Sequence, residues 1–350
     1  MGRSVSSSIS AFSSVDLLED ALSEPTEALR HTLASVPGDI LVLGAGGKMG
    51  PSLAIMARRA AEHNLPKPRR IFAASRFSRP PVEANLKRHG VETIPCDLLD
   101  PDALERLPDA PNVIFMAGTK FGSTGAEPHT WATNAHLPGL VCRRFRKSRI
   151  VAFSTGNVYP FVPVAAGGSS EDDPAGPVGE YAMSCLGRER VFEHFSTALS
   201  IPVAIVRLSY AVEMRYGVLV DLAQRVYRGE PIDLTMGSFV AIWQRDAAAM
   251  SLRLLQHAGS PPLVVNITGP ETLSVRRVAT EFGRLMHRDP VFAGEECGRA
   301  LISSASRSQL LLGYPETSIA EVIRWTANWI LRGCETYGKP TKFETMDGRF

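Results

Sequence analysis

The sequence predicts an α/β fold built around a doubly wound parallel sheet. Six short runs, ILVL, RIFAAS, VETIP, NVIFMA, RIVAFS and VAIVRLS, alternate with stretches of helical periodicity, as in parallel strands joined by crossover helices. Most of these runs are continuously apolar, which is expected of strands buried on both faces. A doubly wound sheet of this kind commonly has strand order 3-2-1-4-5-6, which we expect here, with the run near residues 262–268 returning to the sheet as a seventh strand.

A glycine-rich turn, LGAGGKMG, follows the first expected strand. Gly44, Gly47 and Gly50 are spaced GxxGxxG before a helix whose apolar residues share one face. Glycine at these positions permits a tight turn, close approach of the backbone to a pyrophosphate and close packing of the helix on the sheet. The helix N-terminus then faces the anion. The turn therefore predicts a dinucleotide-binding site rather than a purely structural connection.

The end of the second expected strand indicates which dinucleotide is bound. Ser75-Arg76 stands where a site for NAD usually places Asp or Glu against the ribose 2′-hydroxyl. A guanidinium beside a small hydroxyl suits a 2′-phosphate, which a carboxylate would repel. We expect NADP as the cofactor, with NAD as the alternative in which Arg76 is simply solvated.

Four segments are expected along the chain: an N-terminal extension (residues 1–37), the dinucleotide-binding domain (38–211), a smaller substrate lobe (212–337) and a C-terminal tail (338–350). Residues 1–14 are small and polar and are expected to be disordered. The spacing of Leu17, Leu18, Ala21 and Leu22 predicts a short amphipathic helix after them. Pro25 suits the start of a second helix. The tail lacks periodicity, but its two phenylalanines are expected to pack against the body.

Charge and cysteine content narrow the class of protein. The 350 residues carry 38 Lys and Arg against 36 Asp and Glu, so nothing predicts the basic surface that nucleic acid requires. No apolar run approaches the roughly 20 residues of a membrane span. Five scattered cysteines without a CxxC pair favour a reducing, cytoplasmic compartment. No spacing of His, Cys, Asp and Glu predicts a metal site, and His129 and His136 are expected at the surface or in packing contacts.

Further motifs follow the glycine turn in order. Cys96-Asp97-Leu98 comes after the third expected strand, Ala117-Gly118-Thr119-Lys120 after the fourth, and Asn134 on the next helix. FSTGNVYP follows the fifth strand, and GEYAMSCLGRERVF forms the helix after it. Over about residues 39–332 this series resembles the extended short-chain dehydrogenase/reductases, which are the NAD-dependent epimerase/dehydratase family.

The resemblance implies a Rossmann domain, a homodimer and roles for individual residues. FSTGNVYP is similar to the family's SSxxVYG, which implies that Thr155 is the catalytic Ser/Thr, and Tyr181 matches the catalytic tyrosine of YxxxK. The Ala-Gly-x-Lys loop resembles that of UDP-galactose 4-epimerases, in which the lysine approaches the cofactor. Cofactor contacts are expected at Gly44, Gly47, Lys48, Met49, Gly50, Ser75, Arg76, Asp97, Leu98, Ala117, Gly118, Lys120, Asn134, Ser154, Tyr181 and Ser209.

The chain departs from the family pattern four residues after Tyr181. Cys185 stands where the family carries the lysine that holds the nicotinamide ribose and lowers the tyrosine pKa. An adjacent cation typically lowers the pKa of an acid by about one to three units. Cys185 is interpreted as a small buried residue, with a nucleophilic role as the alternative. Arg188 lies on the same helical face and could supply the charge, although an ion pair at the surface with Glu189 or another acid is the favoured interpretation.

Two functions are consistent with these patterns. The first is an NAD(P)-dependent oxidoreductase or epimerase that acts on a hydroxyl or carbonyl of a polar small molecule such as a sugar derivative, with Tyr181 as acid and base and Thr155 as its hydrogen-bonding partner. The alternative is a catalytically silent NADP-binding sensor or partner-binding protein, which the missing lysine favours. Four arginines are candidates to bind a substrate anion, namely Arg215, Arg225, Arg228 and Arg245.

Overall fold

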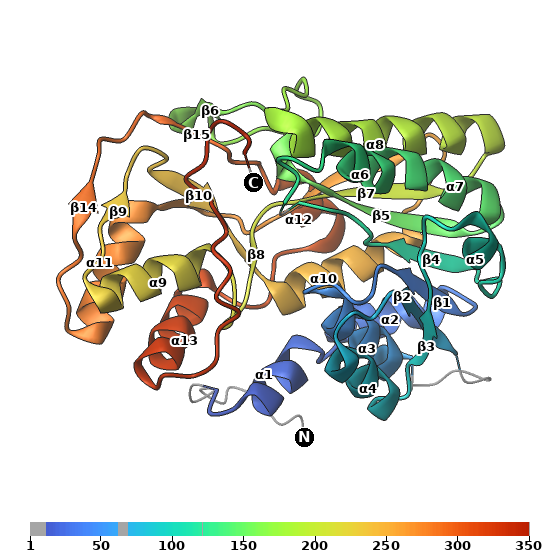
Figure 1. Ribbon diagram of the computed structural model, residues 1–350, viewed down its shortest axis with the longest axis horizontal. Helices are drawn as coiled ribbons and strands as arrows, with labels where there is room; N and C mark the ends of the chain where they lie inside the picture. Colours follow the sequence, from blue (N-terminus) through green and yellow to red (C-terminus); the bar gives the residue numbers. More distant parts are fainter. Residues whose placement is uncertain (1–11, 62–68, 121, 350) are drawn as a thin grey trace.

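A seven-stranded parallel sheet forms the centre of the computed structural model, which describes residues 12–61, 69–120 and 122–349 (Figure 1). Its strands are β1 (Ile40–Leu43), β2 (Ile71–Ser75), β3 (Glu92–Pro95), β4 (Asn112–Phe115), β5 (Arg149–Thr155), β7 (Val203–Leu208) and β12 (Leu263–Ile267). They run in the order β12-β7-β5-β4-β1-β2-β3, and every neighbouring pair is parallel. The expected order and the seventh strand are both confirmed.

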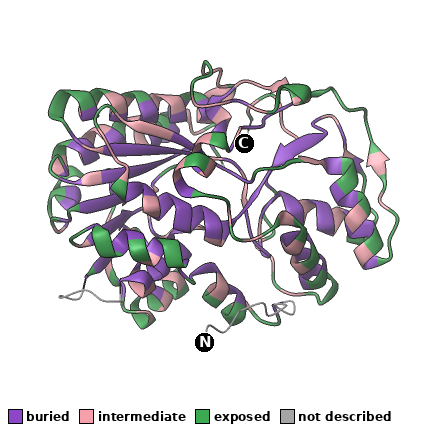
Figure 2. Ribbon diagram, turned by 180° about the vertical axis from the view of Figure 1, so that it is seen from behind, coloured by how far each residue is buried: buried purple, intermediate pink, exposed green. Residues whose placement is uncertain are grey.

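Each strand buries side chains on both faces of the sheet. Ile40 and Val42 of β1 pack on one face, and Leu41 and Leu43 pack on the other. The first face is covered by α2 (Glu27–Ser35), α3 (Gly50–Ala60) and α10 (Gln244–Arg253), and the second by α5 (Pro101–Glu105), α7 (Leu137–Arg144) and α8 (Gly179–Leu199). Figure 2 shows buried strands between helices whose outer faces are exposed. Burial on both faces explains the continuously apolar runs.

Two capped helices form the N-terminal extension. Helix α1 (Val15–Leu22) has Ser14 as its N-cap, and α2 begins at Glu27 because the Thr26 side chain accepts a hydrogen bond from the Leu29 amide. The second helix therefore begins two residues after Pro25. Disorder up to residue 14 is wrong for Phe12, which is buried between Trp243 and Trp325. Residues 1–11 of that prediction lie outside the described part of the chain.

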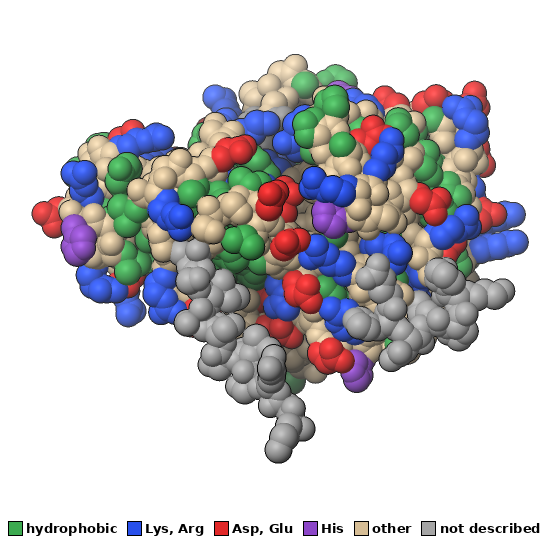
Figure 3. Space-filling model, turned by 90° about the horizontal axis from the view of Figure 1, so that it is seen from below, with side chains coloured by type: hydrophobic (Ala, Val, Ile, Leu, Met, Phe, Trp, Pro, Cys, Tyr) green, Lys and Arg blue, Asp and Glu red, His purple; other side chains and the backbone are tan. Residues whose placement is uncertain are grey.

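Acidic side chains of α1 join the extension to the rest of the molecule. Asp20 pairs with Arg59 at 2.7 Å and Glu19 pairs with Arg215 at 3.0 Å. On the face seen from below, basic and acidic side chains are interspersed (Figure 3). None of the described helices is long and apolar enough to cross a membrane.

A second group of helices packs beside the sheet, at the left of Figure 1. It consists of α9 (Val218–Arg228), α11 (Val275–Met286) and α13 (Ile319–Leu331), with the antiparallel pair β10 (Ser238–Val240) and β13 (Thr272–Ser274). Its buried residues form a separate cluster that includes Leu219, Phe239 and Phe282. Helix α10 lies within the same stretch of sequence but packs against α3 and the sheet.

Short elements connect these parts: α4 (Pro80–Arg88), α6 (Glu127–Trp131), a π-helical turn (Ala132–His136), 3-10 turns at Gly156–Val158, Val164–Ala166 and Leu254–Gln256, α12 (Ser306–Leu312), and strands β6 (Val162–Pro163), β8 (Ala211–Val212), β9 (Ile232–Asp233), β11 (Ile242–Trp243), β14 (Phe292–Ala293) and β15 (Arg299–Ala300).

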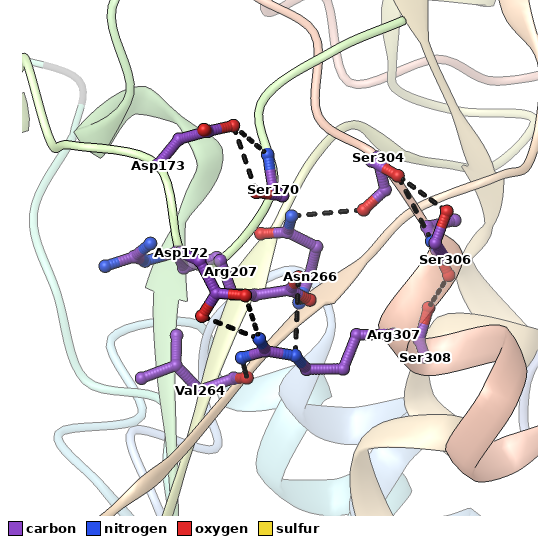
Figure 4. A network of polar contacts seen from close by, with 12 residues as sticks. Ser170, Asp172, Asp173, Arg207, Val264, Asn266, Ser304, Ser306, Arg307 and Ser308 are labelled. Atoms are coloured by element: carbon purple, nitrogen blue, oxygen red, sulfur yellow. Dashed lines mark hydrogen bonds and ion pairs between the residues drawn. The ribbon is translucent and has the colours of Figure 1, made fainter.

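A network of polar contacts fastens the edge strand β12 to two loops (Figure 4). The Asn266 side chain donates to the carbonyls of Ser169 and Ser304 at 3.1 Å. Arg307 of α12 donates to Asp172 at 2.8 Å. The 303–308 segment is thereby fixed near the end of β7, where the Ser303 and Ser209 hydroxyls lie 2.9 Å apart.

The C-terminal tail packs on the body of the molecule. Phe343 is buried against Phe239, and Thr341 donates from its amide to Asp221 of α9 at 2.8 Å. The tail continues until Gly348 lies against Gly179 at the start of α8. The expected packing is confirmed for Phe343, whereas Phe350 lies outside the described residues.

Candidate active site

Two cavities meet at the carboxyl ends of the central strands. The inner cavity, of about 370 Å³, is lined by residues that follow β1, β4, β5 and β7. The outer cavity, of about 250 Å³, is lined by residues that follow β1, β2, β3 and β4. Gly44, Gly47 and Gly118 line both. The carboxyl edge of a doubly wound sheet is where such folds bind ligands.

Close contacts with the backbone explain the glycines at positions 44 and 50 of the turn. Gly44 has φ +84°, and a Cβ there would lie 2.6 Å from the Ala117 amide nitrogen. A Cβ on Gly50 would lie 2.4 Å from the Ala45 carbonyl oxygen, so α3 can begin there only with glycine. Gly47 differs, because the nearest atom to its Cβ would be the Gly44 oxygen at 3.5 Å. A side chain at Gly47 would therefore fill open space between the two cavities.

Gly46 is a further glycine of the turn that packs closely on its neighbours, although the GxxGxxG spacing does not include it. A Cβ there would lie 2.6 Å from the Ser75 Oγ. The turn thus packs directly on the end of β2, whose next residue is the exposed Arg76. Both Ser75 and Arg76 line the outer cavity, opposite the exposed Asp97 and the buried Leu98 after β3.

Asn134 fixes the loop that follows β4. Its side chain accepts a hydrogen bond from the Thr119 amide at 2.9 Å and donates to the Thr119 carbonyl at 3.0 Å. It also donates to the Ser184 Oγ of α8 at 2.9 Å. Asn134 lies on the π-helical turn, a deviation that often marks functional sites. Asn134 does not line either cavity but orients the loop that carries Gly118 and Lys120, which do.

Tyr181 and Thr155 both line the inner cavity. Thr155 ends β5, and Tyr181 lies in the first turn of α8. Burial raises the pKa of Tyr181 well above its usual value and Cys185 raises it further, while Arg188 and a hydrogen bond with Thr155 lower it. The two hydroxyls that the sequence assigns to catalysis are therefore in contact, and the tyrosine is held in its protonated form at neutral pH.

The structure corrects the favoured interpretation of Arg188. This residue is only 6% exposed and lines the inner cavity. It donates to the Phe153 carbonyl at 2.7 Å and to the Asn134 Oδ1 at 2.7 Å. Among the described residues no carboxylate pairs with it. Glu189 instead is fully buried and pairs with Arg207 at 2.8 Å, because its side chain points toward the sheet rather than toward solvent.

The surroundings of Cys185 and Ser154 indicate structural rather than catalytic roles. Cys185 is fully buried, in agreement with its interpretation as a small apolar residue. Burial raises the pKa of its thiol, which opposes a nucleophilic role. The Ser154 Oγ donates to Glu189 at 2.5 Å, so this serine is part of the buried network around Arg207 even though it lines the inner cavity.

Two lysines also line the inner cavity. Burial lowers the pKa of Lys48 to about 7, and the charges of Lys339 and Lys120 lower it further, whereas Asp221 and Glu213 raise it. The Lys48 ammonium lies 3.1 Å from the centre of the Tyr216 ring. Burial likewise lowers the pKa of Lys120 to about 8. Anionic ligands would therefore be favoured in this cavity.

Most of the expected cofactor contacts converge on the two cavities. The inner cavity includes Gly44, Gly47, Lys48, Met49, Gly50, Gly118, Lys120, Ser154, Tyr181 and Ser209, and the outer cavity adds Ser75, Arg76, Asp97, Leu98 and Ala117. Sequence reasoning missed Tyr210, Tyr216, Gln244 and Thr341, which reach the inner cavity from distant segments without any local motif. His129 and His136 are exposed, as expected, although His129 borders the outer cavity.

The four candidate arginines of the second half lie outside both cavities. Arg215 pairs with Glu213 and Glu19, and Arg225 pairs with Glu344. The remaining two also have carboxylate partners, since Arg228 approaches Glu230 and Arg245 pairs with Asp246 and Glu316. Within the described residues, no group of three or more His, Cys, Asp or Glu could hold a metal ion.

Comparison with known proteins places this geometry in a family. Among solved structures, MoeE5 in complex with UDP-glucuronic acid and NAD is 22% identical, with TM-score 0.67 over 85% of this chain and 100% of that chain. A Bacillus cereus UDP-glucuronic acid 4-epimerase in complex with NAD is 18% identical, with TM-score 0.67 over 84% of this chain and 99% of that chain. The Thermus thermophilus UDP-glucose 4-epimerase complex with NAD is 20% identical, with TM-score 0.68 over 84% of this chain and 99% of that chain.

These structures share the fold at low sequence identity, and no curated protein sequence matches the chain. A sequence model of a family does match. It is that of the NAD dependent epimerase/dehydratase family, and it extends over residues 40–268, from β1 to the end of β12. The chain therefore belongs to the NAD dependent epimerase/dehydratase family.

Proposed function

We propose that this protein is an NAD(P)-dependent oxidoreductase or epimerase that acts on a hydroxyl or carbonyl of a polar small molecule such as a sugar derivative. The observation that carries this proposal is the hydrogen-bonded pair Thr155 and Tyr181 in the cavity that begins at the glycine turn. Family membership makes enzymatic activity the expectation, and the similar structures named above contain NAD with UDP-glucuronic acid, or NAD alone.

The residues present fit a nicotinamide dinucleotide. Gly47 leaves open space where both cavities meet, at the N-terminus of α3, which suits a pyrophosphate. The adenosine half would lie against Asp97 and Leu98, with Ser75 and Arg76 beside a 2′-phosphate. This placement supports NADP as the preferred cofactor, with NAD as the alternative. When bound, the nicotinamide would accept a hydride from the substrate carbon or return it.

Tyr181 would hold or move the proton at the reacting oxygen. Its raised pKa keeps the phenol protonated at neutral pH, so Tyr181 can donate a proton to a carbonyl during reduction. Oxidation of a hydroxyl requires the phenolate and is therefore expected to be faster at alkaline pH. The Thr155 hydroxyl donates to the Asn157 Oδ1 at 3.0 Å in this structure. With substrate bound, it would turn to donate to the same substrate oxygen and fix its position.

The rival proposal is an NADP-binding sensor or partner-binding protein without turnover. Cys185 in place of the family lysine favours it, because the phenolate of Tyr181 is poorly stabilised. Under either proposal the ligand is a small molecule, and the family resemblance implies a homodimer. All five cysteines are free, which supports a cytoplasmic location.

The test compares cofactor binding with turnover. NADPH binding is measured by fluorescence titration, and turnover is followed at the nicotinamide absorbance with a panel of carbonyl compounds and UDP-sugars. Tyr181→Phe should lower turnover by roughly 10²–10⁴-fold while leaving the NADPH Kd unchanged, since only the phenol oxygen is lost. Tyr314→Phe, at an exposed tyrosine, is the matched control. Full turnover in Tyr181→Phe would contradict the mechanism, and NADPH binding with no turnover on any substrate would favour the sensor.

A further inference from the structure

Arg188 is a buried cation whose hydrogen-bond partners are all neutral. It donates to the Phe153 carbonyl at 2.7 Å, the Asn134 Oδ1 at 2.7 Å and the Asn134 carbonyl at 3.3 Å. No ion pair joins it to a carboxylate in the described part of the chain. A buried charge usually has a counter-charge, because removing an ion from water is costly. The nearby Arg207 follows that rule through Glu189, so the charge of Arg188 is left to act on the inner cavity.

The surrounding residues make room for this guanidinium. A Cβ on Gly118 would lie 2.6 Å from the Arg188 Nη2, so the glycine of the Ala-Gly-x-Lys loop allows the guanidinium to lie beneath that loop. Cys185, one turn before Arg188 on α8, is fully buried and short. Three hydrogen bonds to two elements also fix the position of the charge, as a preorganised site requires.

Three titratable or charged groups face Tyr181: Cys185 and Arg188 from α8, and Lys120 from the loop after β4. Of the two cations, Arg188 lowers the pKa of Tyr181. The Lys120 ammonium lies 5.5 Å from the centre of the Tyr181 ring, over its face. Lys120 therefore places a second positive charge near the ring, and Arg188 is the cation with the larger effect on the pKa of Tyr181.

We propose that Arg188 takes over the electrostatic role of the family's lysine at position 185, as the positioning residue that supplies a fixed positive charge beside Tyr181. This inference rests on the proposed function of Tyr181 as acid and base. Because Cys185 and Arg188 lie on one buried face of α8, that face carries one cation, Arg188. A second one at position 185 would meet the charge of Arg188 three residues away.

The test measures the ionisation of Tyr181 directly, without substrate. The full-length protein is labelled with fluorotyrosine, whose phenol is more acidic, and titrated by ¹⁹F NMR, with Tyr181→Phe used to assign the resonance. Arg188→Met should raise the titration midpoint of Tyr181 by about one to three pH units. Arg188→Lys should keep it close to that of the unmodified protein, and the double variant Cys185→Lys/Arg188→Met should restore it. Arg190→Met, at an exposed arginine of the same helix, is the matched control.

Two further measurements separate the outcomes. Cys185→Lys alone should lower the melting temperature, because it places two cations together, and adding Arg188→Met should recover part of that loss. Comparing the melting temperatures of Cys185→Lys and the double variant keeps the proposal testable if Arg188→Met alone does not fold. An unchanged midpoint in folded Arg188→Met, or a larger shift in Lys120→Met, would overturn it. NADPH binding in each variant reports separately on the proposed function, since a normal ¹⁹F result with no NADPH binding would count against that function alone.

Discussion

The glycine turn (Gly44–Gly50) and the start of α8 (Tyr181–Glu189) border the same cavity but contribute to it in opposite ways, the turn by leaving space and α8 by supplying polar side chains. In the turn, function depends on missing side chains, because a Cβ on Gly44, Gly46 or Gly50 would lie within 2.6 Å of a neighbouring atom. In α8, it depends on charges and hydroxyls that must be present. Room for close approach to the backbone can come only from a glycine at that point of the chain. A charge, in contrast, can come from any residue whose side chain reaches the site. The turn accordingly keeps the GxxGxxG spacing, whereas α8 carries Cys185 where the resemblance implies a lysine.

The largest effect is expected from filling the open space of the turn. Gly47→Val should abolish NADPH binding and leave the fold intact, because the added side chain enters the cavity and meets little protein. Calorimetry measures the binding and circular dichroism the fold. Gly259→Val is the control, since its Cβ also has its nearest neighbour at 3.5 Å but lies outside both cavities. Normal affinity in Gly47→Val would place the cofactor elsewhere.

The next largest effect is expected from removing a buried charge on α8. Glu189→Gln should lower the free energy of unfolding by about 3–5 kcal/mol, because Arg207 would remain buried without its counter-charge. Urea denaturation measures the change. Glu193→Gln removes a half-buried partner of the exposed Arg190 on the same helix and should cost at most about 1 kcal/mol. Similar losses in the two variants would show that burial of the pair contributes nothing.

A smaller effect is expected at the end of β2. Arg76→Ala should weaken NADPH binding by about 1.5–3 kcal/mol through loss of a charged hydrogen bond and leave NADH binding unchanged. Arg79→Ala, three residues further along, serves as the control, because Arg79 does not line the outer cavity. Equal Kd values for NADH and NADPH in the unmodified protein would exclude a preference for NADP.

The smallest effect concerns pH and Lys48. Its pKa is lowered to about 7 by burial, so the ammonium is charged below this pH and neutral above it. Attraction of an anionic dinucleotide is therefore present at pH 6 and lost as the pH rises through 7. We expect the NADPH Kd to increase by about fivefold between pH 6 and 8, for an ion pair of about 1 kcal/mol. Lys48→Met should keep only the smaller pH dependence that Lys120, with a pKa of about 8, contributes. An unchanged fivefold effect in that variant would assign the titration to another group.

The opposite outcomes for Arg188 and Glu189 show where sequence reasoning reached its limit. Helical spacing placed Arg188 on the face of Tyr181, but the same spacing allows a solvent-exposed pair with Glu189. The choice depended on distant partners, namely Asn134 and the Phe153 carbonyl for one residue and Arg207 for the other. Such contacts join segments that have no fixed separation along the chain.

By itself, the sequence determined the parallel sheet and the glycine turn, because they follow from local periodicity and from a motif whose geometry is fixed by the backbone. Its strand order followed from the fold class, and the Thr155–Tyr181 pair from the resemblance to the family. The tertiary structure decided which charges are neutralised, that the tail brings Thr341 to the inner cavity, and that Arg188 is buried beside Tyr181. The physical reason is that electrostatic effects depend on distance and burial in space, whatever the separation of the residues in sequence.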